Sequence, residues 1–291
     1  MRYFYAKMGT GNTLASEYLS GRTPINKPAI PIFFNCVPGT RSEFLKNGGA
    51  KEQGRNFFEC ADNPENSIIV VINQGKLYLT APVGDVEFWK APEDLSYLKK
   101  GEFVKLLPIK IISEIPLSDV PAILASITAN AYYYTGTFRE IKDLGNICAL
   151  KSLLNKPVDD FDYDKPEQLL LCLSSIELET LIAKIFEEGG CFVPAYRGGA
   201  IKDIDIFAKN LTNKDIKIGK FEIPSRSSIS IQVKRTPHKR KKPAGCDYII
   251  TLHGDRAREI IDLVKNTNGT KKWLKNSLDW LPGKILRGYG L

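Results

Sequence analysis

Two stretches in the C-terminal half of the sequence carry polar side chains at the two-residue spacing of a β-strand. Asp203 and Asp205 stand in "DIDIFA", and Gln232 and Lys234 stand in "SISIQVKR". Alternate residues of a strand point to one face, so each pair shares a face. If the two strands are neighbours, Asp205, Gln232 and Lys234 converge on one small space. Carboxylate and amide oxygens suit Mg²⁺, and a lysine can stabilise the negative charge that develops at a phosphate.

A helix predicted over residues 174–189 supplies a further acidic group. The residues of its apolar face are Leu178, Leu181, Ile182 and Ile185. Glu179 lies close to the edge of this face, and Glu177 is the alternative acid. A helix packed on the sheet can bring a second carboxylate to the same end of the sheet as Asp205.

The basic stretch "KRTPHKRKK" follows the second strand directly, and Pro237 prevents a simple extension of that strand. The cations expected to bind phosphates on either side of a cut are Arg235, Lys239, Arg240, Lys241 and Lys242. Such contacts position a nucleic-acid backbone and carry no sequence information. The alternative is a solvated loop without a ligand.

The net charge of +8 is concentrated in the C-terminal part of the chain. Residues 1–160 contain 18 Lys and Arg against 17 Asp and Glu, a net of +1, whereas residues 161–291 contain 23 against 16, a net of +7. A basic surface attracts polyanions through counterion release, which favours nucleic acid as the partner. A solubilising surface is the alternative explanation for the charge alone.

The composition argues against several other classes of protein. The six cysteines form no C-x-x-C pair and are expected to be reduced, and His238 and His253 lack the spacing of a zinc-ligand pair. No apolar run approaches the roughly 20 residues of a membrane span. Since the first residues also lack the apolar core of a secretory signal, we expect a cytoplasmic protein without a membrane partner.

The elements expected in the C-terminal part predict an α/β domain. They are the helix over 174–189, strands near 191–195, 203–208 and 228–235, a strand at 247–252 and a helix at 255–265. A helix, antiparallel strands, a crossover and a final strand form a central mixed sheet with flanking helices.

The N-terminal part is expected to be a mixed α+β domain with a curled, barrel-like sheet. "NSIIVVINQGKLYLTAPV" predicts two strands joined at Asn73-Gln74-Gly75, and "EFVKLLPIKIISEI" predicts another extended segment. Short helices are predicted at 41–49 and 118–129. Because two prolines and five acidic residues interrupt the apolar pattern over 155–168, we predict domains at 1–155 and 169–291 with a linker at 156–168.

The C-terminal motifs resemble those of a known superfamily. "LETLIAKIFEEGGCFV", "DIDIFA" and "ISIQVKR" are similar, in order and spacing, to the motifs of PD-(D/E)xK nucleases, and more narrowly to Mrr-like restriction endonucleases with Q-x-K in place of E-x-K. The resemblance covers about residues 174–265 and implies a restriction-endonuclease-like fold. Ile204 stands where the family name places proline, and a glycine-rich run precedes Lys202. These departures leave open whether Asp203 shares the metal-binding role of Asp205.

The resemblance implies a role for each residue of the motifs. Asp205 would ligate Mg²⁺, with Mn²⁺ as a substitute, together with the backbone carbonyl of Val233 and the amide oxygen of Gln232. Lys234 would orient the attacking water and stabilise the transition state. Glu179 would position metal-bound waters from the helix.

Aromatic side chains in the N-terminal part suggest a module that selects the target. Phe88, Trp89 and Tyr97 are the candidates for a base pocket, and the segment from "VKLLPIKIISEIPLSDVP" to "TGTFREI" weakly resembles the PUA-like superfamily that includes EVE and YTH domains. Members of that superfamily often hold a flipped base between aromatic rings. The alternative is that Trp89 and residues 132–134 pack in the core or in a hairpin.

Together these features predict a Mg²⁺-dependent DNA endonuclease of a restriction or defence system, with modified DNA as one possible target. Two alternatives remain: a Holliday-junction resolvase or other structure-selective nuclease, and a non-catalytic nucleic-acid-binding protein. Double-strand cleavage by one active site per chain favours a homodimer, at least during cutting.

Overall fold

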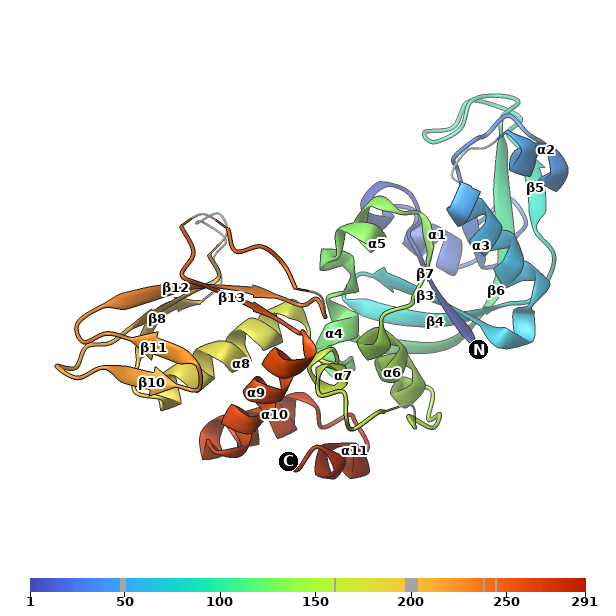
Figure 1. Cartoon of the computed structure of the whole chain (residues 1–291). Coiled ribbons are helices and arrows are strands. Elements are labelled where there is room, and N and C mark those ends of the chain that lie inside the picture. The colour runs from blue at the N-terminus through green and yellow to red at the C-terminus, as the bar shows by residue number, and fades with distance from the viewer. Residues whose placement is uncertain (48–50, 160, 197–203, 238, 244) are drawn as a thin grey trace. The chain divides into compact units, whose positions relative to one another are not determined.

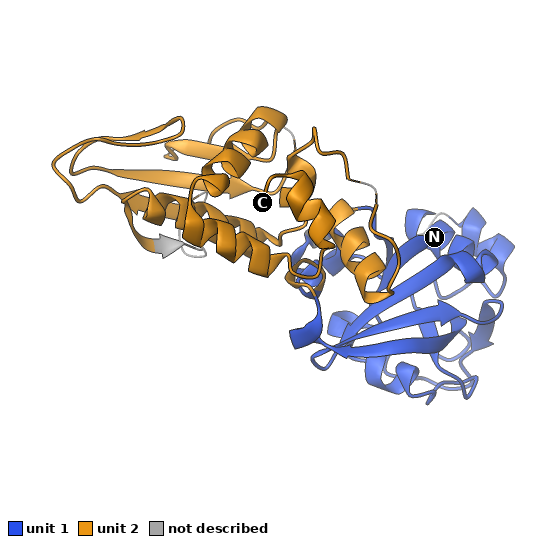
Figure 2. Cartoon of the chain, turned by 90° about the horizontal axis from the view of Figure 1, so that it is seen from below, with its two compact units in different colours: residues 1–120, 125–142 blue, residues 121–124, 143–291 orange. Residues whose placement is uncertain are grey.

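The chain forms two compact units. The computed structural model describes residues 1–47, 51–159, 161–196, 204–237, 239–243 and 245–291 (Figure 1). Unit 1 comprises Met1–Val120 and Ala125–Lys142, and unit 2 comprises Pro121–Leu124 and Asp143–Leu291 (Figure 2). Each unit has a mixed sheet of its own, as the alternation of strand and helix patterns predicted.

The sheet of unit 1 has seven strands. They are β1 (Arg2–Ala6), β2 (Ala29–Ile32), β3 (Ser67–Asn73), β4 (Lys76–Pro82), β5 (Glu87–Lys90), β6 (Phe103–Pro116) and β7 (Phe138–Glu140). The order is β2-β6-β4-β3-β1-β7, and β5 also pairs with β6. Strands β1 and β3 are parallel, and the other pairs are antiparallel.

Strand β6 curls this sheet into a half-barrel. Its first half pairs with β2 and β5, and its second half pairs with β4. The register shifts between Leu79 and Thr80, which face Ser113 and Ile111, so Ile112 is an extra residue on β6. A bulge of this kind bends the strand and increases its twist. The predicted hairpin is confirmed: Gln74 and Gly75 both have positive φ, as a two-residue turn between β3 and β4 requires.

The helices of unit 1 are short. They are α1 (Ala15–Leu19), α2 (Arg41–Lys46), α3 (Lys51–Asp62) and α5 (Ala131–Thr135). Helix α2 confirms the start of the helix predicted at 41–49, of which residues 48–49 lie outside the described part. The helix predicted at 118–129 is divided into η3 (Leu117–Asp119), α4 (Ala122–Ala125) and η4 (Ile127–Ala129). Pro121 explains the first break, because the residue before a proline avoids helical angles and Val120 is extended.

Aromatic rings fill the core of unit 1. Phe4 stacks on Phe138 at a centroid distance of 5.3 Å, and Phe57 meets Phe138 edge-on at 5.3 Å. These three side chains come from β1, α3 and β7 and are fully or almost fully buried. Ring packing across the sheet therefore holds α3 on its face.

Unit 2 contains the four-stranded sheet β13-β12-β9-β8. Its strands are β8 (Phe192–Tyr196), β9 (Ile206–Lys209), β12 (Ser228–Lys234) and β13 (Tyr248–Thr251), and a separate hairpin consists of β10 (Ile216–Ile218) and β11 (Phe221–Ile223). Strand β12 is antiparallel to β9 and parallel to β13. This arrangement confirms the predicted order of antiparallel strands followed by a crossover strand.

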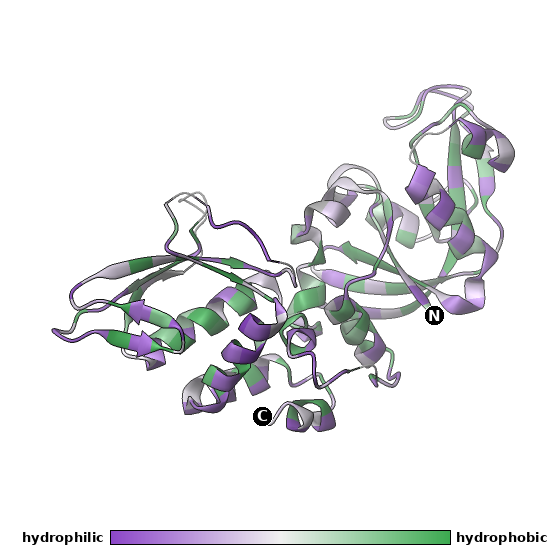
Figure 3. Ribbon diagram, in the orientation of Figure 1, coloured by the Kyte–Doolittle hydropathy of each residue, from purple (hydrophilic) through white to green (hydrophobic). Residues whose placement is uncertain are grey.

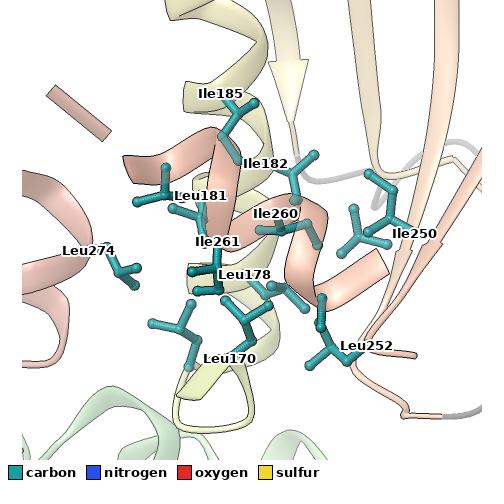
Figure 4. Packing of buried hydrophobic residues seen from close by; sticks show 14 of the residues in the cluster. Leu170, Leu178, Leu181, Ile182, Ile185, Ile250, Leu252, Ile260, Ile261 and Leu274 are labelled. Atoms are coloured by element: carbon teal, nitrogen blue, oxygen red, sulfur yellow. The ribbon is translucent and has the colours of Figure 1, made fainter. Parts of the chain in front are cut away.

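The helices of unit 2 are α6 (Leu144–Leu153), α7 (Glu167–Leu170), α8 (Ser175–Glu188), α9 (Gly254–Lys265), α10 (Asn268–Ser277) and α11 (Gly283–Gly288). The apolar face predicted for α8 is confirmed, since Leu178, Leu181, Ile182 and Ile185 are all buried. They pack with residues of β13, α9 and α10 (Figure 4). Figure 3 shows apolar residues along α8 and hydrophilic residues along α9.

The division between the units differs from the predicted domain boundary. We predicted an N-terminal domain that ends at residue 155, whereas unit 2 already begins at Asp143 and includes α6. Helix α6 belongs to unit 2 because its buried Cys148 is part of the hydrophobic cluster formed with α8. The segment at 156–168, with its prolines and acidic residues, therefore follows α6 within unit 2.

A buried lysine joins the long strand of unit 1 to the segment after β2. Lys105 is fully buried, and its Nζ donates to the carbonyl oxygens of Phe34 and Asn35 at 2.8 Å each. The ammonium group also lies 4.9 Å from the ring centre of Phe44. Burial lowers the pKa of Lys105 to about 8, because removal from water disfavours the charged form.

This lysine makes the stability of the protein depend on pH. Between pH about 8 and 10.5 an unfolded chain keeps a proton that the folded protein has released, so the free energy of unfolding should rise with pH by up to about 3 kcal/mol. Chemical denaturation from pH 7 to 11 gives the free energy of unfolding of the wild type and of Lys105→Met. The difference between these two free energies measures the contribution of Lys105 at each pH. A difference that stays constant with pH would contradict the prediction.

Candidate active site

The predicted polar residues lie on one face of β12. Ile229, Ile231 and Val233 occupy its other face and are part of the hydrophobic core of unit 2. Gln232 is buried, with 3% of its surface exposed, whereas Lys234 is half-buried at the end of the strand. The structure thus confirms the predicted strand and the core position of its apolar residues, whereas Ser230 and Gln232 on the other face are buried as well.

Asp205 is joined to β12 by its side chain. The regular pairing of β9 with β12 ends at Ile206 and Ile231. One residue further, the Asp205 carboxylate accepts a hydrogen bond from the Val233 N–H at 2.7 Å, and the Asp205 N–H donates to the Ile231 carbonyl at 2.9 Å. In a regular ladder, the Val233 N–H would donate to a backbone carbonyl of the neighbouring strand. The Asp205 carboxylate replaces that carbonyl as the acceptor, between the backbone positions that carry Gln232 and Lys234.

The donors at this point fit a hard divalent cation. One oxygen of Asp205 holds the Val233 N–H, which fixes the orientation of the carboxylate. In a strand the N–H and C=O of one residue point to the same side, so the Val233 carbonyl also faces the side of β9. A carboxylate, a backbone carbonyl and the amide of Gln232 are oxygen donors that suit Mg²⁺ when waters complete its shell. Within the described ranges, no three His, Cys, Asp or Glu residues group closely enough to hold a metal by themselves.

Helix α8 gives its two candidate acids different surroundings. Glu177 is part of a capping box: its carboxylate accepts from the Ser174 N–H at 2.8 Å, and its own N–H donates to the Ser174 hydroxyl at 3.2 Å. This bond occupies Glu177 at the helix start. Glu179 lies on the next turn, outside the capping box, and is half-buried, as Glu177 is. Asp203 lies outside the described residues.

Arg235 differs from the other predicted phosphate-binding cations. Its guanidinium group bonds to Asp143 and to the backbone carbonyls of Leu171 and Leu173, and only 14% of its side chain is exposed. These contacts already supply acceptors for the guanidinium group inside unit 2. The basic residues that remain open to a ligand are therefore those of the following segment.

The segment that contains the basic cluster is held at its far end. Asp247 accepts from both the N–H and the hydroxyl of Ser230, at 2.7 and 2.8 Å, and donates its own N–H to that hydroxyl at 3.0 Å. These bonds lower the pKa of the Asp247 carboxyl, because they favour its charged form. Between this link and Arg235 the side chains of Lys239, Arg240 and Lys241 are exposed.

Two of the predicted cations line a pocket of about 340 Å³ in unit 2, which we call the basic groove. Lys239 and Arg240 meet Lys220 from the β10–β11 turn and Arg256 from α9 there. Sequence reasoning missed Lys220 and Arg256, because no pattern linked them to the basic stretch. Arg256 is bonded to Glu259 at 2.6 Å, and Asp255 also lines the groove, so its excess of positive charge comes from Lys220, Lys239 and Arg240.

The basic groove shares a sheet face with the polar residues of β12. Its floor includes Ile249 and Thr251 of β13, which pair with Gln232 and Lys234. Paired residues on adjacent strands point to the same face. A polyanion in the groove would therefore run along the face that carries Lys234. Lys241 and Lys242 are exposed on the same segment, and Lys242 donates to the Asp247 carbonyl at 3.3 Å.

The aromatic residues predicted to form a base pocket pack against the core of unit 1. The ring of Phe88 stacks on Phe58 at 6.4 Å, and the ring of Tyr97 lies 5.0 Å from Phe33. Trp89 is half-buried and contacts the same cluster. The structure thus gives these three side chains packing partners within unit 1.

A different set of residues lines a pocket of about 440 Å³ in unit 1, which we call the aromatic pocket. Tyr5 and Tyr134 contribute rings, and Lys7 lies 5.5 Å from the centre of the Tyr134 ring. Asn12 and Gln74 border the pocket, and both have positive φ, at 61° and 47°. The sequence shows Tyr5 on β1, Lys7 just after it and a run of tyrosines at 132–134, but no local pattern indicated that these segments meet.

Comparisons with known proteins do not identify the chain. No protein-family model matches it, and no curated protein or solved structure is significantly similar to it. In the part of the chain that the structure describes, no helix is long and apolar enough to cross a membrane.

The basic groove predicts how binding to DNA should depend on salt. Combined replacement of Lys239, Arg240 and Lys241 by alanine should weaken binding to all duplex sequences alike and reduce the salt slope by about 1 for each phosphate that is no longer neutralised. Titrations of a labelled duplex at several salt concentrations measure both effects. Replacement of Lys271, Lys272 and Lys275 on α10 removes the same charge and should leave the slope nearly unchanged. Equal slopes for the two triple variants would contradict a specific role of the groove.

Proposed function

We propose that the protein is a Mg²⁺-dependent DNA endonuclease that hydrolyses phosphodiester bonds. The observation that carries the proposal is the bond of the Asp205 carboxylate to the Val233 N–H, which holds an acid beside the backbone that bears Gln232 and Lys234. The resemblance of these motifs to PD-(D/E)xK nucleases, in the Mrr-like form with Q-x-K, supports the same reaction. A restriction or defence role is part of this proposal.

The residues of the chain have separate tasks in this reaction. Asp205, the Val233 carbonyl and Gln232 would hold Mg²⁺, which when bound makes a water more acidic and offsets charge on the phosphate. Lys234 donates to the phosphate oxygens and orients the attacking water as the P–O bond to the leaving oxygen breaks. Glu179 orients waters from the side of α8. Because Gln232 is neutral, the site has one negative charge fewer than a site with a glutamate at this position. We therefore expect weak metal affinity.

The basic groove gives the substrate a path to this site. Lys239 and Arg240 line the groove together with Ile249 and Thr251, which pair with Gln232 and Lys234, so a polyanion bound there would lie near β12. Contacts to phosphates supply affinity without base discrimination. The groove therefore supports duplex DNA as the substrate. Because each chain has one candidate site, cleavage of both strands would need a homodimer during the reaction.

Substitutions at the site test the catalytic proposal. Asp205→Asn keeps an oxygen for the Val233 N–H but removes the charge, and Lys234→Ala removes the cation. Each should lower the rate of Mg²⁺-dependent cleavage by about 100-fold or more while DNA binding stays intact. Cleavage of plasmid and linear DNA with Mg²⁺ or EDTA measures the rate.

Lys209→Ala is the matched control, because Lys209 is an exposed lysine on the neighbouring strand β9 and should be replaceable. Full cleavage by the Asp205 or Lys234 variant would overturn the assignment. A protein that binds DNA but cuts no substrate with Mg²⁺ or Mn²⁺ would instead be a non-catalytic binding protein. A clear preference for branched over linear DNA would indicate a structure-selective nuclease.

We also propose that unit 1 selects the target by accepting a single base, and that the aromatic pocket is the place where the base binds. Its volume of about 440 Å³ lies within the roughly 300–1,000 Å³ of small-molecule pockets. Tyr134 is 67% exposed, so a large part of its side chain can contact a ligand, beside the Lys7 ammonium that lies over its ring. Gly11 borders the pocket with open space where a Cβ would stand. A modified base in otherwise ordinary DNA is a ligand that such a pocket can distinguish.

Tyr134 tests this second proposal. Tyr134→Ala should remove a stacking surface worth about 1–3 kcal/mol and lower the affinity for the preferred DNA by roughly tenfold to hundredfold. Tyr134→Phe keeps the ring and should bind like the wild type. Titrations with unmodified, cytosine-modified and adenine-modified duplexes measure the discrimination. If Tyr134→Ala discriminates among these duplexes as the wild type does, bases are read elsewhere.

A further inference from the structure

We propose that Arg235 is a positioning residue of the candidate active site, which holds the end of β12 against the segment that leads into α8. The inference rests on the proposed function, because it concerns how Lys234 and Glu179 are kept in place. Arg235 follows Lys234 directly, and Leu173 precedes Ser174, the N-cap of α8. One side chain therefore connects the two elements that carry the candidate catalytic groups.

The guanidinium group of Arg235 makes four hydrogen bonds to three separate residues. Nε donates to the Leu173 carbonyl at 2.7 Å, and Nη2 donates to the two carboxylate oxygens of Asp143 at 2.9 and 3.1 Å. Nη2 also donates to the Leu171 carbonyl. The planar fork of an arginine can satisfy several acceptors at once, whereas a lysine offers a single charged atom.

Burial makes these bonds important for geometry. Only 14% of the Arg235 side chain and 26% of the Asp143 side chain are exposed. Asp143 is also the N-cap of α6, where it accepts from the Asn146 N–H at 3.2 Å. Loss of the guanidinium group would leave a largely buried carboxylate without its cation and two carbonyls without their Arg235 donor, which the structure can correct by moving these segments.

The position of Arg235 determines which catalytic side chains would be displaced if its hydrogen bonds were lost. A shift of the backbone at residue 235 displaces Lys234 first, because the two residues share a peptide bond. A shift of residues 171–173 displaces the start of α8, and Glu179 lies about one turn along that helix. A misplacement of about 1 Å at a catalytic group can lower the rate by roughly 100-fold. Arg235 thus acts on the reaction through Lys234 and Glu179.

The test separates positioning from phosphate binding and from stability. Arg235→Gln and Arg235→Lys are compared with the wild type in single-turnover cleavage, with folded protein in excess over DNA and Mg²⁺ present. We expect the rate to fall by roughly tenfold to hundredfold in Arg235→Gln and by less in Arg235→Lys. The affinity for DNA and its salt slope should not change, because the charge of Arg235 is already balanced by Asp143.

Two further variants serve as controls. Asp143→Asn keeps an oxygen acceptor for Arg235 and should lower the rate less than Arg235→Gln does. Leu274→Ala opens the core at α10, away from the sheet, and should lower the melting temperature of the protein by several degrees without lowering the single-turnover rate.

Three results would overturn the inference. A wild-type rate in Arg235→Gln excludes a positioning role, and a reduced salt slope makes Arg235 a phosphate ligand instead. An equal loss of rate in Leu274→Ala assigns the effect to stability alone. If the unchanged protein cuts no DNA at all, the proposed function fails first, and that result is distinct because it does not depend on any substitution.

Discussion

The hydrogen bond between the Val233 N–H and the Asp205 carboxylate is the constraint on which the candidate site depends. Regular pairing between β9 and β12 stops at Ile206 and Ile231. A buried N–H beyond that point needs an acceptor, and the side chain of Asp205 supplies one. The bond both ends the ladder and fixes an acid beside two polar side chains of β12. Asp205 thus satisfies a backbone N–H and also supplies the carboxylate of the candidate site.

Two further side-chain links hold β12 in place. At its C-terminal end Arg235 links the strand to the starts of α6 and α8, and near its middle Ser230 holds Asp247. The basic segment is thereby held at Arg235 and at Asp247, whereas Lys239, Arg240, Lys241 and Lys242 between them are exposed. Charges that would repel one another in a compact core can lie together there, because water surrounds them and a polyanion can bind them.

The fold of unit 1 depends on the curvature of its sheet. The long strand β6 pairs with three other strands and is bent by a bulge, so the sheet curls around an aromatic core. The aromatic pocket lies where the loop after β1 approaches the β3–β4 turn, and both segments have residues with positive φ there.

The sequence by itself determined the features that depend on local periodicity. The apolar face of α8, the apolar residues of β12 and the β3–β4 turn follow from spacings of two to four residues, and the structure confirms them. Tertiary structure alone decided which polar residues meet. Arg235 and Asp143 are separated by 92 positions, and Lys220 reaches the basic groove from a distant hairpin. Local patterns contain no information about such contacts, because they depend on how elements pack. For the same reason the sequence did not predict that α6 belongs to unit 2 or that Phe88 and Tyr97 pack against the core. The capping box of Ser174 and Glu177, by contrast, is a local S-x-x-E pattern that the sequence does contain.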